Sequence, residues 1–119
     1  MSASQSTTLI LLPQTTYNGG GTANVYTVIG NAQPAAAYYL NNSDLQTVNI
    51  NLSNVTGNIV IEASLATTPG TGDWFSVYEL EASSSNVSSY TNIQGNFVFM
   101  RAKVVDFSQG VVNFVKLSY

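Results

Sequence analysis

The sequence contains no cysteine, no histidine and few charged residues, and each absence excludes a class of structure or chemistry. Without cysteine, disulfides, thiolate metal sites and cysteine nucleophiles are excluded, so the 119 residues must be held together by their packing. Without histidine, the commonest general base and metal ligand is missing. Three cationic and six acidic side chains give a net charge of −3, which argues against a nucleic-acid partner.

Long apolar stretches are also missing. The longest unbroken runs, Leu9–Leu12 and Ala35–Leu40, fall far short of the ~20 residues that a membrane-spanning helix needs. The first six residues contain neither a basic residue nor the apolar stretch of a signal peptide. We therefore expect no membrane partner and a protein that is made and used in a cytoplasm.

Uncharged polar residues take the place of the missing charges. Serine, threonine, asparagine and glutamine together make up 45 of the 119 residues, whereas charged residues make up 8%. An ordinary soluble domain has about 25% charged residues. Hydrophobic content is a normal 45%, which predicts a packed core. Such a surface fits either a mildly acidic soluble protein or a component of a repeating assembly, where charge repulsion between copies would be costly.

Alternation of apolar and polar residues with a period of two dominates the chain and predicts an all-β fold. The expected strands are Thr7–Pro13, Thr22–Ile29, Leu45–Leu52, Asn58–Ala66, Trp74–Ala82, Asn96–Phe107 and Val111–Tyr119, with Ala35–Leu40 ambiguous between strand and helix. Turns are expected at Ser53–Gly57 and Ser108–Gly110. We predict a single antiparallel β-sandwich of about seven or eight strands, jelly-roll or immunoglobulin-like, over residues 9–119, preceded by a flexible arm over residues 1–8.

Few residues could carry catalysis. Glu79 and Glu81 lie two apart on one expected strand, as a glycosidase pair could. Cross-strand ion pairs with Arg101 and Lys103 explain the same carboxylates better. Asp73 in a glycine-rich loop is a single carboxylate, which makes a weak calcium site. We therefore expect no enzyme, no metal and no cofactor.

The expected strand Asn96–Phe107 is apolar on both faces and is the main candidate for a binding role. One face contains the candidate protein-contact residues Phe97, Phe99, Arg101 and Lys103. An apolar strand face of this kind is covered by a loop, by the N-terminal segment or by another subunit. In the competing interpretation, carboxylates of the same chain (Glu62, Glu79, Glu81) neutralise the cations and a second sheet covers the rings.

Trp74 is the candidate for a different function, because an exposed indole can stack on a sugar ring. Together with the tyrosines and the amide-rich surface, it leaves open a carbohydrate-binding module for surface glycans.

Four segments of the C-terminal half carry a resemblance to a known family. They are Gly57–Ala66, Asp73-Trp74-Phe75, the strand Gly95–Val104 (GNFVFMRAKV) and the terminal strand Gly110–Tyr119 (GVVNFVKLSY). This half is similar to small virion structural proteins of tailed phages, of the T4-like type found in marine cyanobacterial phages. Met100 stands where isoleucine is more usual, a harmless exchange at a core position.

The resemblance implies a β-sandwich that is part of a phage particle. The expected function is that of a capsid decoration or cement protein, located in the virion, which binds the outer surface of the major capsid protein shell or other virion proteins. We also expect a homo-oligomer, with a trimer as one arrangement. A neck, tail or tail-fibre structural protein is the alternative within the same class.

Overall fold

The computed structural model describes residues 8–17, 26–37 and 45–119, and all structural statements below concern these residues. They contain seven strands: β1 (Thr8–Leu12), β2 (Thr15–Thr16), β3 (Tyr26–Ile29), β4 (Gln33–Pro34), β5 (Leu45–Ser64), β6 (Phe75–Gln94) and β7 (Phe99–Ser118). The single helical segment in this part of the chain is the 3-10 turn η1 (Thr71–Asp73), and no helix there is long and apolar enough to cross a membrane.

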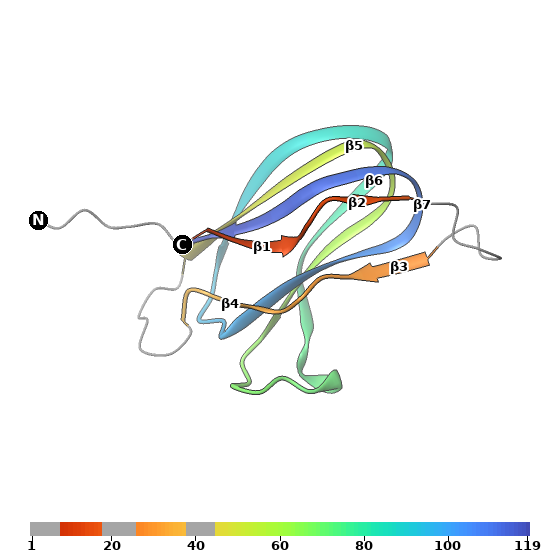
Figure 1. The fold of residues 1–119 in the computed structure, drawn as a ribbon. Helices are drawn as coiled ribbons and strands as arrows, with labels where there is room; N and C mark the ends of the chain where they lie inside the picture. The colour runs from red at the N-terminus through yellow and green to blue at the C-terminus, as the bar shows by residue number, and fades with distance from the viewer. Residues whose placement is uncertain (1–7, 18–25, 38–44) are drawn as a thin grey trace, which may run out of the picture.

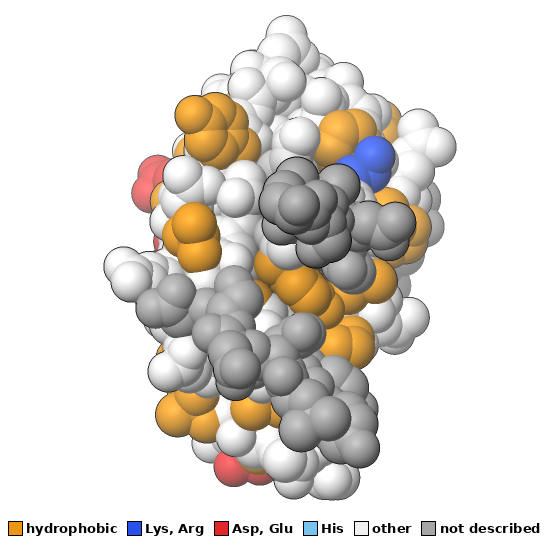
Figure 2. All heavy atoms as spheres, turned by 90° about the vertical axis from the view of Figure 1, so that its left-hand side faces the viewer, with side chains coloured by type: hydrophobic (Ala, Val, Ile, Leu, Met, Phe, Trp, Pro, Cys, Tyr) orange, Lys and Arg blue, Asp and Glu red, His pale blue; other side chains and the backbone are white. Residues whose placement is uncertain are grey.

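All seven strands belong to one open antiparallel sheet, which confirms the all-β prediction. The order of strands is β1-β7-β5-β6, and β2, β3 and β4 also pair with β7. On the face seen in Figure 2, backbone and uncharged polar atoms separate scattered apolar side chains, and charged side chains are few. This agrees with a surface hydrated mainly by hydroxyls and amides.

Three strands of 20 residues each, β5, β6 and β7, give the sheet its shape. They rise together, bend at the same level and return, so the sheet folds over on itself into two facing halves, consistent with a β-sandwich (Figure 1). The prediction that strands end in turns at Ser53–Gly57 and Ser108–Gly110 is wrong, because these segments are bends inside β5 and β7. The polar segment Ser83–Gln94, which follows the expected strand Trp74–Ala82, continues β6.

Residues in the left-handed backbone region mark the bends. They are Asn54 (φ 54°), Ser84 (φ 47°), Asp106 (φ 56°) and Gly110 (φ 90°). Short polar side chains and glycine reach this conformation at least cost, which is why turn-type residues occur here. At each bend the pairing register also shifts, as at a β-bulge. The residue types that predict turns therefore form bulges here, and these bulges bend a single continuous sheet.

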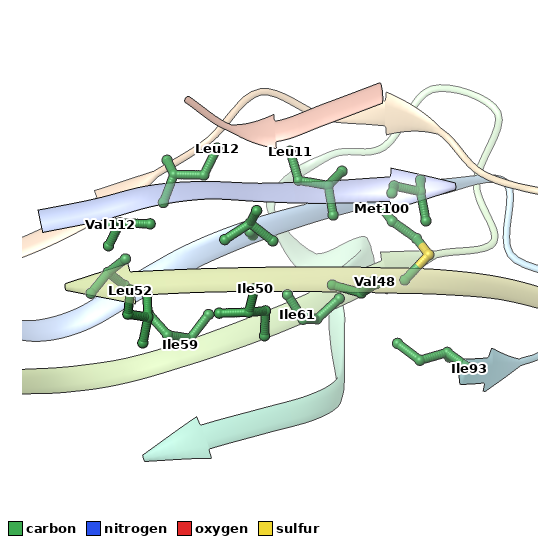
Figure 3. Packing of buried hydrophobic residues seen from close by; sticks show 14 of the residues in the cluster. Leu11, Leu12, Val48, Ile50, Leu52, Ile59, Ile61, Ile93, Met100 and Val112 are labelled. Carbon is green, nitrogen blue, oxygen red and sulfur yellow. The ribbon is translucent and has the colours of Figure 1, made fainter. Parts of the chain in front are cut away.

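The bulges keep the apolar side chains inside on both sides of each bend. Along β5 the residues of the core cluster are even-numbered before the shift between Leu52 and Val55 (Val48, Ile50, Leu52) and odd-numbered after it (Val55, Ile59, Ile61, Ala63). One extra residue reverses the alternation, so that odd-numbered side chains point to the inner face of the folded sheet in the second half of the strand. Figure 3 shows the result: Ile50, Leu52, Ile59 and Ile61 of β5 pack together with Leu11 and Leu12 of β1.

The N-terminal segments cover the outer edge of β7. β1 and β2 pair with its residues 111–118, and β3 and β4 pair with its residues 99–107. Thr8, placed in the expected arm, belongs to β1 and pairs with Ser118, whereas residues 1–7 lie outside the described residues. The ambiguous segment Ala35–Leu40 begins with a turn after β4, and residues 38–44 lie outside the described residues.

The connection of residues 95–98 carries the chain from one half of the sheet to the other. β6 ends at Gln94, opposite the start of β5, and β7 begins at Phe99, opposite the end of β5. The buried side chain of Gln46 anchors this crossing. Its Nε2 donates to the carbonyls of Ile93 (2.9 Å) and Gly95 (3.1 Å), and its Oε1 accepts from the N–H of Ala36 (3.1 Å).

Candidate functional site

An ion cluster on the outer face of β5 and β7 contains two of the predicted contact residues. Glu62 on β5 lies opposite Arg101 on β7, and Lys103 lies two residues further along β7. Arg101 Nε donates to Glu62 Oε1 at 2.7 Å, and Lys103 Nζ lies 3.1 Å from Glu62 Oε2. One carboxylate therefore pairs with both cations, as the competing interpretation of the sequence expected for Glu62.

Burial and hydrogen bonding act in opposite directions on Glu62, which is 8% exposed. Burial alone would raise the pKa of this carboxyl, but the hydrogen bonds and positive charges of Arg101 and Lys103 outweigh it and lower the pKa. The carboxylate thus stays ionised and is a poor proton donor. Glu79 and Glu81 are exposed on β6, and within the described chain neither forms an ion pair.

Trp74 joins the ion cluster from the loop before β6. The guanidinium carbon of Arg101 lies 4.3 Å from the centroid of the indole ring, in a cation–π contact. The ring is half-buried, and this face of it is occupied by the protein's own arginine. A sugar would have to stack on the opposite face or displace Arg101 from its carboxylate.

Phe97 and Phe99 do not share one strand face, contrary to the expectation from the sequence. β7 begins at Phe99, and Phe97 lies in the connection before it. The ring of Phe97 lies directly over Gly95 and meets the ring of Phe75 edge-on, with centroids 5.8 Å apart. Phe97 also packs against the core cluster, so this ring is covered by the chain itself.

Two exposed apolar side chains at the same end of the sheet were not predicted. Leu65, at the end of β5, is 62% exposed, and Phe75, at the start of β6, is 40% exposed. Alternation along Asn58–Ala66 places Leu65 on the buried face with Ala63, but β5 ends at Ser64 and the chain leaves the sheet there. Phe75 lies opposite Ala63, one residue from Glu62, so the apolar pair lies at the same end of the sheet as the ion cluster. We call Leu65, Phe75, Trp74, Arg101 and Lys103 the contact patch.

Asp73 stabilises the loop between β5 and β6. Its Oδ2 accepts from the N–H of Gly70 at 2.7 Å, and its own N–H donates to the carbonyl of Gly70 at 3.2 Å. The carboxylate closes this loop on itself. Among the described residues, no three acidic side chains gather in a way that could hold a metal ion.

The contact patch combines exposed apolar surface with two cations that are already paired with Glu62. Comparison of the chain with family models, with curated proteins and with solved structures finds no match.

Proposed function

We propose that this chain is a non-enzymatic structural protein of a phage virion, and that it decorates and stabilises the outer surface of the major capsid protein shell. The similarity of its C-terminal half to small virion proteins supports the particle as its location. The observation that carries the binding role is the exposed pair Leu65 and Phe75 at the end of the sheet that also contains the ion cluster.

The energetics of the contact patch favour attachment to another protein. Burying a leucine or phenylalanine side chain completely contributes about 1.5–3 kcal/mol, and more than a third of each of these residues is exposed. One such patch gives weak binding. If several copies act together in an oligomer or on a lattice, the effective affinity rises by orders of magnitude.

The charges of the patch add selectivity for an acidic surface. Two cations share the single carboxylate of Glu62, so the cluster has a local positive excess on a chain whose net charge is −3. Charge complementarity of this kind raises the association rate and fixes the orientation of the partner.

Quantitative mass spectrometry of purified particles tests the location. A decoration protein should be present in on the order of hundreds of copies, since it follows the symmetry of the shell. A count of about six to twelve would place the protein in the neck or tail instead.

The double variant Leu65→Ser/Phe75→Ser tests the contact patch. Because neither side chain belongs to the core cluster, the variant should still fold, which thermal unfolding checks. It should lose attachment to particles stripped of the wild-type protein. Ile29→Ser is the matched control, since Ile29 is 54% exposed on β3. Full attachment of the double variant, or equal loss with Ile29→Ser, would refute the assigned patch.

A further inference from the structure

The two outer edges of the sheet differ in how they are covered. At the β1 edge, Gln33 Nε2 donates to the carbonyl of Ile10 at 3.1 Å, and Gly30 packs directly against the carbonyl of Leu11. At the opposite edge, β6 has a strand neighbour on one side alone among the described residues, namely β5. An open strand edge is a template for another strand unless the protein blocks it.

Half of the β6 edge is blocked by charge. Glu79 and Glu81 are exposed on its first half, and a second chain paired there would have to accommodate both carboxylates. Charged side chains on an edge strand are a common protection against such pairing.

The bend of β6 is blocked by its own serine side chains. The N–H of Ser83 donates to Ser85 Oγ, and Ser85 Oγ donates to the carbonyl of Ser83, both at 3.1 Å. The N–H of Ser84 donates to Thr56 Oγ1 at 3.0 Å. These backbone groups are already used and cannot extend a ladder to a further strand.

Neither protection extends to residues 86–94. The sequence NVSSYTNIQ contains no charge, no proline and no glycine, and Val87, Tyr90, Thr91 and Ile93 are good strand formers. Tyr90, at its centre, is 71% exposed, more than any other large apolar side chain in the described chain. This segment is therefore an unblocked edge with an uncovered aromatic ring.

We propose that residues 86–94 pair antiparallel with the same residues of a second copy, so that a two-fold dimer continues the sheet from one copy to the next. A second copy fits because pairing around Tyr90 sets uncharged residues against uncharged residues, while Glu79 and Glu81 stay outside the ladder. The same pairing covers Tyr90. A nine-residue ladder is about 30 Å long. Such an interface is small for a specific complex, so we expect a dissociation constant in the micromolar range.

Sedimentation equilibrium of the purified chain tests the dimer without any particle, so the result is independent of the proposed virion function. The wild type should reach twice the 12.7 kDa chain mass as its concentration rises. Ser89→Lys should raise the dissociation constant at least about tenfold, since a charge on an edge strand opposes pairing. Ser76→Lys, an equally exposed change on the blocked half of β6, should leave it unchanged.

Cross-linking tests the register, and the absence of native cysteine makes it specific. Under mild oxidation, Tyr90→Cys should form a disulfide-linked dimer within the concentration range of the equilibrium, because residues beside the two-fold axis come close enough for a disulfide. Ser76→Cys should form no disulfide-linked dimer under the same conditions. Thermal unfolding of every variant confirms that it is folded.

Three results would overturn the proposal. They are a wild type that remains monomeric at millimolar concentration, a dimer that Ser89→Lys does not weaken, and cross-linking as rapid through residue 76 as through residue 90. A wild type that forms a dimer through another surface would give the second result.

Discussion

Replacing Gln46 by methionine tests the crossing between the two halves of the sheet. Methionine has nearly the shape of glutamine but cannot replace its hydrogen bonds. The substitution would leave the carbonyls of Ile93 and Gly95 and the N–H of Ala36 without the side-chain partner they have in the folded protein. Since Gln46 is 1% exposed, water cannot readily substitute for the lost partner.

The expected loss follows from the three hydrogen bonds. A net contribution of about 1 kcal/mol for each gives about 3 kcal/mol, and the cost rises toward ~5 kcal/mol if the buried groups stay unsatisfied. For a domain of this length, 1 kcal/mol corresponds to about 4 °C in the midpoint of thermal unfolding. Gln46→Met should therefore lower the midpoint by about 12 °C or more.

Urea denaturation followed by circular dichroism measures this loss. Gln109→Met is the matched control, because Gln109 makes an exposed side-chain bond to Ser84 at 3.3 Å, and it should cost less than about 1 kcal/mol. If Gln46→Met were no more destabilising than Gln109→Met, the crossing would not depend on this glutamine, and the energetic argument would be refuted.

Three further predictions concern charge, burial and close packing. Glu62→Gln should cost about 2 kcal/mol at pH 7. Because the pKa of Glu62 is lowered on folding, this difference should shrink in urea titrations as the pH falls below the ordinary 4.5, and a pH-independent difference would contradict it. The pKa of Tyr119 is raised by burial, so the stability it contributes is complete below pH 10 and is lost as the pH rises through the folded pKa. Tyr119→Phe, which removes the bond to the carbonyl of Pro34, should cost about 1 kcal/mol at pH 7 and lose that deficit in alkaline urea titrations, whereas a deficit that persists would count against it. Gly30→Ala should cost at least about 2 kcal/mol because its Cβ would overlap the carbonyl of Leu11, while Gly72→Ala, with open space around it, should melt like the wild type.

The sequence predicts which segments form strands and which side chains are buried better than it predicts where the strands end. Alternation places Val48, Ile50 and Leu52 on one buried face, as observed. It does not distinguish a tight turn from a bulge within a continuous strand, because both use the same residues. Asn54 and Gly110 satisfy the local requirements of a turn, but the long-range pairing of β5 with β7 continues on both sides of them, so each strand bends there without ending.

The candidate site was predicted in part. Spacing alone places Arg101 and Lys103 on one strand face, and the structure adds that a single carboxylate, Glu62, holds both. The sequence could not reveal that Phe97 leaves that face, because this depends on where β7 begins. The exposure of Leu65 likewise depends on β5 ending at Ser64, which alternation along the strand does not indicate.

Because β5, β6 and β7 each run through both halves of the folded sheet, neither half has a backbone of its own. Opening one half pulls on the strands of the other, and Thr8 finds its partner Ser118 only once almost the whole sequence has been synthesised. The domain should accordingly behave as one cooperative unit, with the slowest-exchanging amides of both halves sharing a single opening free energy. Proteolytic cleavage at any of the three bends should then release no stable half-domain.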